Sequence, residues 1–229
     1  MNPATSTKLR NLYTMKRAHI MIRTLTLGLL ISATSIFSQY KAESAGAPPA
    51  ELAASVAGLL QKDGVKITGA GNKVLCEIWL RAAMPSGTKS AEDNLSMPTI
   101  PHGSLLGSIR FPSQHADRRG QGVKPGLYTM RFSMFPQNGD HQGVAPQRDF
   151  MVLSQATEDK DGAANPAFDA LMVMSRKASG TPHPLVFSMW KDEAGAKQGF
   201  EKQGENDWVL HVKIGDVPVA IILVGKAEG

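Results

Sequence analysis

The densest group of reactive side chains lies in the segment PQNGDHQGVAPQRDF, residues 136–150. Asp140 is adjacent to His141 there, and Arg148 is adjacent to Asp149. A histidine beside a carboxylate can serve as a general base or a metal ligand, and an arginine can bind an anionic ligand. Prolines and glycines also interrupt the segment, which is typical of a polar hairpin loop. We therefore treat these four residues as candidate ligand-binding residues and assign none of them a catalytic role.

Glu77 and Trp79 form a second candidate site, on the polar face of the predicted strand KVLCEIWL at residues 73–80. A tryptophan ring exposed on a sheet could stack on a sugar, and the carboxylate could accept hydrogen bonds from sugar hydroxyl groups. Such a pair would suit a carbohydrate-binding module. The alternative is that Trp79 packs beneath the long loop at residues 84–102.

Local motifs for enzymatic chemistry are missing from the sequence. It has no G-x-S-x-G elbow, no H-E-x-x-H pair and no glycine-rich phosphate loop. The histidines after residue 44 are dispersed, at positions 102, 115, 141, 183 and 211. We therefore predict no metal site and no cofactor. A metal-dependent or hydrolytic enzyme that uses His141 stays open as an alternative, because residues far apart in sequence can converge in the fold.

Residues 1–44 have the layout of a secretory signal and leader. A basic segment precedes the apolar run TLTLGLLISATSIF at residues 24–37, which is too short for a comfortable membrane span. Small residues follow, and cleavage is predicted after Ser44, with Ser38 and Ala45 as alternative positions. This layout predicts a secreted or periplasmic protein with no stable membrane span once the signal is removed.

Removal of residues 1–44 would change the net charge of the chain. They hold six of the 25 basic residues and one of the 20 acidic ones, so residues 45–229 carry equal numbers of both. The sequence pI of about 9.4 therefore reflects the leader and gives no support to nucleic-acid binding. Cys76 is the single cysteine, so no intramolecular disulfide can form, and its alternating context predicts a buried thiol.

The rest of the pattern is mainly that of β-strands. Apolar and polar residues alternate in LYTMRFSMF, residues 127–135, which predicts a strand with one buried face. Helix signals are a proline-led apolar stripe in residues 46–64 and a segment at 165–180 with Asn165 as N-cap and Gly180 as its closing glycine. Further strands are predicted at residues 65–67, 73–80, 103–111, 148–155, 184–190, 207–214 and 217–225.

These elements favour a mainly β fold, an antiparallel β-sandwich of about eight or nine strands with one or two short helices. The length of residues 45–229 suits a single domain of this kind. The turn-rich spacing between the strands is typical of such sandwiches.

The segment VKPGLYTMRF, residues 123–132, resembles the PG-x-Y-T start of a strand in secreted bacterial β-sandwich domains. These include transthyretin-like and carboxypeptidase-regulatory-like modules and several uncharacterised exported families. In such a strand the glycine permits the turn and the tyrosine packs at the strand start. The resemblance implies an exported β-sandwich, and it implies no catalytic residues.

Together these features predict an exported, soluble β-sandwich protein of the bacterial envelope with a non-catalytic binding or structural role. Its partner would be a glycan or another envelope protein, and nucleic acid is not expected. A carbohydrate-binding module that uses Trp79 and an enzyme that uses His141 are the alternatives.

Overall fold

The computed structural model describes residues 39–135, 148–193 and 197–227. Every described residue belongs to the second of the chain's two units, Ser38–Gly229. Asp140 and His141 lie outside the described residues. Within the described ranges, no helix is long and apolar enough to cross a membrane.

The second unit is mainly β, as predicted. Its described residues form one ten-stranded antiparallel sheet and a separate two-stranded hairpin of β5 (His115–Ala116) and β6 (Gly122–Val123). In sheet order, the ten strands are β1 (Lys41–Gly46), β2 (Gly64–Thr68), β3 (Val74–Leu80), β4 (Leu105–Phe111), β7 (Gly126–Met134), β8 (Asp149–Gln155), β9 (Leu185–Lys191), β12 (Val217–Val224), β11 (Asp207–Ile214) and β10 (Gly199–Gln203).

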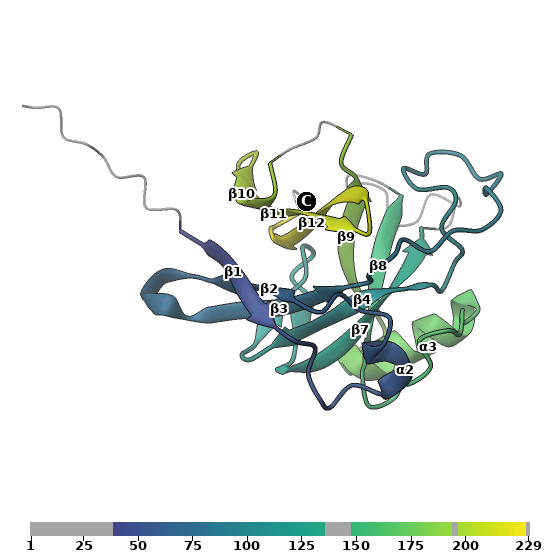
Figure 1. The fold of residues 1–229 in the computed structure, drawn as a ribbon, viewed down its shortest axis with the longest axis horizontal. Coiled ribbons are helices and arrows are strands. Elements are labelled where there is room, and N and C mark those ends of the chain that lie inside the picture. Colours follow the sequence, from purple (N-terminus) through teal and green to yellow (C-terminus); the bar gives the residue numbers. More distant parts are fainter. Residues whose placement is uncertain (1–38, 136–147, 194–196, 228–229) are drawn as a thin grey trace, which may run out of the picture. The chain divides into compact units, whose positions relative to one another are not determined.

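The predicted sandwich of eight or nine strands is wrong, because the ten strands form a single sheet that is nearly closed as a barrel. The sheet curls so that β11 and β12 lie across from β1, β2 and β3 (Figure 1). Its two end strands, β1 and β10, contact each other. Neither of these strands was predicted from the sequence. Residues 41–44 of β1 fall in the predicted leader, and β10 is short and mostly polar.

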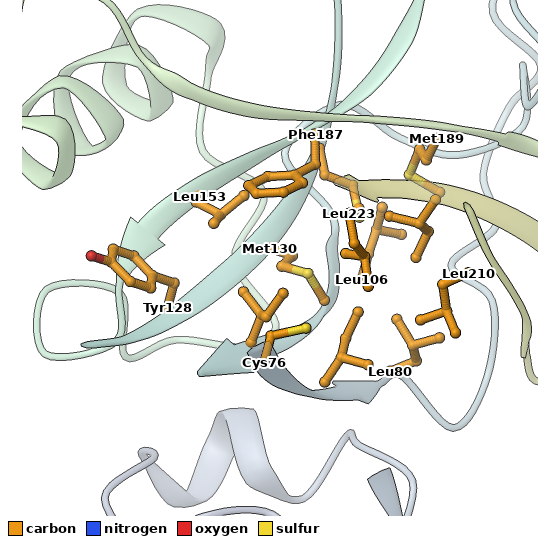
Figure 2. Close-up of a cluster of buried hydrophobic side chains, with 14 of the residues drawn as sticks. Cys76, Leu80, Leu106, Tyr128, Met130, Leu153, Phe187, Met189, Leu210 and Leu223 are labelled. Atoms are coloured by element: carbon orange, nitrogen blue, oxygen red, sulfur yellow. The ribbon is translucent and has the colours of Figure 1, made fainter. Parts of the chain in front are cut away.

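Apolar side chains from both halves of the sheet meet in its interior (Figure 2). Leu80 of β3, Met130 of β7, Phe187 of β9 and Leu210 of β11 belong to one buried cluster. Cys76 is part of this cluster and is fully buried, which confirms the predicted buried thiol, and burial raises its pKa. The interior is therefore a packed core.

Strand β7 is buried on both faces, although its sequence alternates. Tyr128 and Met130 face the core, as predicted. Thr129 and Arg131, on the opposite face, are also fully buried. The alternation therefore predicts the inner face correctly, but the outer face is covered by a part of the chain that is distant in sequence.

Arg131 binds the loop that covers this outer face. Its Nε and Nη2 atoms donate hydrogen bonds to the two carboxylate oxygens of Asp159, at 2.6 and 2.8 Å. Its other N–H groups donate to the backbone oxygens of Gly103, Asp161 and Ala164 at 2.6 to 2.7 Å. Since each of the five N–H donors of this guanidinium has an acceptor, Arg131 has a structural role.

Helices cover other parts of the outer face. The helix predicted at 165–180 is confirmed as α3 (Phe168–Ser179), which ends at Gly180 with a left-handed φ of 72°. Its N-cap position is Ala167 rather than Asn165, and no side chain caps it. Of the helix predicted at residues 46–64, only α2 (Ala54–Ala57) is helical in the structure. A short 3-10 turn, η2 (Ala70–Asn72), follows β2. The residues that pack beneath α3 are Phe135, Phe150, Val152 and Val186.

Candidate functional site

A pocket of about 340 Å³ opens where the two ends of the curled sheet meet, and we call it the seam pocket. Three segments that are far apart in sequence form its walls. They are Ala42, Glu43 and Ser44 of β1, then Asp63, Gly64 and Val65 at the start of β2, and finally Gln198, Gly199, Leu210, His211 and Val212 of the β10–β11 hairpin.

The seam pocket exists because β10 is shorter than β11. Gly199, the first residue of β10, pairs with His211, so β11 continues from Val212 without a β10 partner. Beyond this point the side chain of Gln61 bridges the seam, where its Nε2 atom donates a hydrogen bond to the backbone oxygen of Lys213 at 2.8 Å. The unpaired part of β11 therefore leaves a gap beside β1.

Aromatic side chains close the seam on the other side of the pocket. The ring of Tyr40, which immediately precedes β1, contacts the rings of Phe200 on β10 and Trp208 on β11. These rings pack against the main core cluster. The pocket thus lies between a packed aromatic contact and the Gln61 bridge.

The walls of the seam pocket carry carboxylates and one histidine, and no lysine or arginine is among the described residues that line it. Glu43 is neutralised by Lys41 at 2.5 Å and lies 3.6 Å from Lys66, and the hydrogen bond from Lys41 lowers the pKa of the Glu43 carboxyl. Asp63 Oδ1 accepts hydrogen bonds from Ser44 Oγ at 2.8 Å and from the Gly46 N–H at 2.7 Å. In the described part of the chain, Asp63 forms no ion pair, so its charge is available to a cationic ligand.

His211 on β11 is a buried histidine in the wall of the seam pocket. Its Nδ1 atom lies 2.8 Å from Asp192 Oδ2, and its Nε2 atom lies 3.6 Å from Glu201 Oε1 without a hydrogen-bond partner. A histidine oriented by a carboxylate can act as a general base when a nucleophile lies within hydrogen-bond reach. Among the described residues, no hydroxyl or thiol is hydrogen-bonded to His211, and no group of three or more His, Cys, Asp and Glu could hold a metal ion.

Arg148 anchors the long loop that precedes β4. Its Nε atom donates a hydrogen bond to the backbone oxygen of Phe135 at 2.7 Å, and Nη1 donates to the backbone oxygen of Asp93 at 3.0 Å. Its Nη2 atom pairs with the carboxylate of Glu92. These interactions occupy the guanidinium with groups of this chain.

Asp149 anchors the same loop but does not pair with Arg148. Its Oδ2 atom accepts a hydrogen bond from the Ser96 N–H at 2.5 Å, and its Oδ1 atom has no hydrogen-bond partner. The residue is fully buried, and this burial raises the pKa of its carboxyl. The structure therefore gives both residues of this candidate pair a role in holding a loop.

Trp79 lacks the exposure that sugar stacking requires. The residue is 2% exposed, and its Nε1 atom donates a hydrogen bond to the backbone oxygen of Gly46 at 2.8 Å. It packs with Leu52, Val56 and Leu60 of the segment around α2, and not beneath the loop at residues 84–102. A ring buried on both faces offers no platform to a sugar.

Glu77 lies in the middle of the outer face of β3. It is half-buried and pairs in register with Lys66 on one neighbouring strand and Arg110 on the other. Opposite charges on adjacent strands stabilise a sheet. The predicted association of Glu77 with an exposed Trp79 is therefore not formed.

The residues of the seam pocket were not among those suggested by sequence patterns. Asp192 and His211 are separated by 19 residues, and Ser44 and Asp63 also by 19. No local spacing connects such residues, because strand pairing brings them together. The local signal available is a histidine between apolar residues in a strand, as in VLHV, residues 209–212.

Comparison with known proteins gives no assignment, since no family model, no curated protein and no solved structure matches this chain. A proposed function must therefore rest on the chemistry of the described residues.

Proposed function

We propose that this chain is an exported protein with a non-catalytic binding role, and that it binds its ligand in the seam pocket. The observation that carries the proposal is the contrast between the two concave regions of the sheet. The interior is filled by packed apolar side chains, whereas the seam pocket is an open volume of about 340 Å³ with polar and apolar walls. Ligand sites commonly combine apolar walls with a few polar groups in this way.

The chemistry of the pocket supports binding rather than catalysis. Catalysis by the Asp192–His211 pair would require a nucleophile or an activated water beside Nε2. In the described residues, the nearest charged group to this atom is the carboxylate of Glu201, at 3.6 Å. A carboxylate in this position would bind a cationic group, and it supplies no obvious nucleophile for acyl transfer.

Export is supported by the basic and apolar pattern of residues 1–44. The segment that resembles the PG-x-Y-T strand forms the start of β7, where the Tyr128 hydroxyl donates a hydrogen bond to the backbone oxygen of Lys124 at 2.8 Å. This hydrogen bond closes the turn that precedes the strand.

Nuclear magnetic resonance mapping would test this function. Mixtures of amino acids, polyamines, short peptides and sugars would be added to the isotopically labelled full chain, and the backbone amide shifts of β1, β2 and β11 would be followed. We expect a cationic compound to shift the amides of Ala42, Asp63 and Val212 in a saturable manner.

A matched pair of variants would locate the binding. Ala42→Phe places a large ring in the seam pocket, whereas Ala170→Phe places the same ring on the exposed face of α3. We expect the first variant to lose the shifts and the second to keep them. Saturable shifts confined to another surface, or shifts unchanged by Ala42→Phe, would overturn the proposal.

A further inference from the structure

The seam pocket is flanked by the free edges of two strands. Strand β1 pairs with β2 and not with β10, and β11 lacks a β10 partner from Val212 onward. In an antiparallel pair, alternate residues direct their N–H and C=O groups away from the partner strand. Strand β1 therefore presents backbone groups that an added extended segment could pair with, whereas on β11 the Lys213 carbonyl is already bonded to Gln61.

The seam pocket lies in line with β10. Where β10 is present, it occupies the position between β11 and β1, and its first residue is Gly199. Among the described residues, the seam pocket occupies this position before Gly199, and Gln198 forms part of its wall. An extended segment placed there would continue the line of β10 and would complete the nearly closed sheet.

The side chains around the gap define what such a segment would carry. Val65, Leu210 and Val212 supply apolar wall on the side of the core. Asp63 supplies a carboxylate that forms no ion pair in the described residues, Glu43 is already paired with Lys41, and no lysine or arginine is among the described lining residues. Because side chains alternate along a strand, an apolar residue facing inward and a basic residue next to it would match both surfaces.

We propose that the seam pocket binds a short extended peptide segment carrying a lysine or arginine, which adds to the edge of β1 as a strand. This inference rests on the proposed binding function and specifies the partner. Backbone pairing would supply affinity, and the basic residue would pair with the exposed carboxylate of Asp63.

The charges on the edge strands favour a different chain over a second copy of this one. Edge strand β1 carries Lys41 and Glu43, and β10 carries Glu201 and Lys202. Charged residues on an edge hinder its pairing with identical edges. A peptide with a basic residue beside an apolar one has no such conflict with Asp63.

Fluorescence polarisation with a positional library of fluorescein-labelled, acetylated hexapeptides would test the proposal. We expect the tightest peptides to have lysine or arginine at one position and an apolar residue beside it. Replacement of that basic residue by glutamate should weaken binding by at least about tenfold, because it removes the ion pair and places like charges together. Equal binding of acidic and basic peptides would overturn the charge assignment.

Variants of Asp63 separate the ion pair from structural effects. Asp63→Asn keeps an oxygen that can accept the hydrogen bonds of Ser44 and Gly46, and we expect it to weaken the basic peptide about tenfold. Asp63→Glu keeps the charge and should restore most of the affinity. Glu205→Gln, at the exposed turn between β10 and β11, removes an equal charge outside the pocket and should leave affinity unchanged. The same loss with Glu205→Gln would contradict a specific ion pair.

Peptides N-methylated at alternate backbone amides test strand addition itself, because methylation removes the donors and keeps the side chains. We expect one of the two alternate methylation patterns to abolish binding, and equal binding of both would overturn strand addition. If no peptide binds while small cationic compounds still shift the seam amides, the peptide class is wrong and the binding function stands. If neither binds, both proposals fail.

Discussion

The ring of Tyr40 lies edge-on against the ring of Trp208, with their centroids 4.7 Å apart. Tyr40 directly precedes the first strand of the sheet, and Trp208 lies on β11, next to the last strand in the sheet order. Phe200 completes the contact, with its ring centroid 5.4 Å from that of Tyr40. This aromatic group joins the two ends of the sheet and forms one boundary of the seam pocket.

Truncation of Tyr40 should destabilise the fold. We expect Tyr40→Ala to lower the free energy of unfolding by about 1 to 3 kcal/mol, because it removes two aromatic contacts at the seam. Tyr40→Phe keeps both ring contacts and should lose much less. Guanidinium chloride unfolding followed by tryptophan fluorescence would measure both, and equal stability of Tyr40→Ala and the wild-type chain would contradict the role of this contact.

The position of Tyr40 and β1 also bears on processing of the leader. Cleavage after Ser44 would remove Tyr40 and four of the six residues of β1. Cleavage after Ser38 would keep both. If the chain is exported, we therefore expect the mature protein to begin at Gln39, which intact-mass analysis and N-terminal sequencing of the exported protein would show. A mature protein beginning at Ala45 or Gly46 would contradict this expectation.

Loss of the carboxylate that pairs with Arg131 should be severely destabilising. Asp159→Ala leaves a fully buried guanidinium without its bidentate partner, and breaking such a pair costs about 3 to 5 kcal/mol. Lys177→Ala breaks an exposed ion pair with Glu158 nearby and should cost less than about 1 kcal/mol. Denaturant unfolding of the two variants would compare them. Similar losses in both would show that the Arg131 hydrogen bonds contribute little.

Asp149 should make stability depend on pH. Burial raises the pKa of its carboxyl in the folded chain, so the folded state binds a proton more readily than the unfolded state. The stability linked to this proton is fully present below the unfolded pKa of about 3.9, and it is lost as pH rises through the higher folded pKa. Asp149→Asn cannot ionise, so its stability relative to the wild-type chain should rise as pH increases from about 4 toward neutrality.

Urea unfolding of the two chains at a series of pH values would measure this difference. Glu205→Asn, at an exposed turn, serves as a control for the loss of one carboxylate. Parallel stability curves for wild-type and Asp149→Asn chains would contradict a raised pKa at this buried position.

The sequence pattern predicted those elements that local periodicity determines. The alternation around Met130 identified β7 and its inner face, and the signals before Gly180 identified α3. The burial of Arg131 was not predictable in this way, because the loop containing Asp159 covers a polar strand face from 28 residues away. The alternating pattern predicts that Arg131 faces solvent. Its burial is tolerated because each N–H group of the guanidinium donates a hydrogen bond to an acceptor of this chain.

The near-closure of the sheet could not be predicted from local sequence patterns either. Alternation specifies that a strand has one apolar face, but both a sandwich and a curled sheet bury that face. The choice depends on long-range pairing, such as that of β9 with β12 and the contact between β1 and β10. The seam pocket is a product of this closure, so the sequence pointed instead to Arg148 and Asp149, which hold a loop.

Hydrogen–deuterium exchange of the β1 amides tests the binding of a peptide at the seam most directly. The full chain would be measured with and without a saturating amount of the tightest lysine-containing hexapeptide, and with its glutamate counterpart at the same concentration. We predict slower exchange of alternate amides in Lys41–Gly46 with the lysine peptide only. If the exchange of the β1 amides is unchanged while the peptide is bound, strand addition at the seam is contradicted.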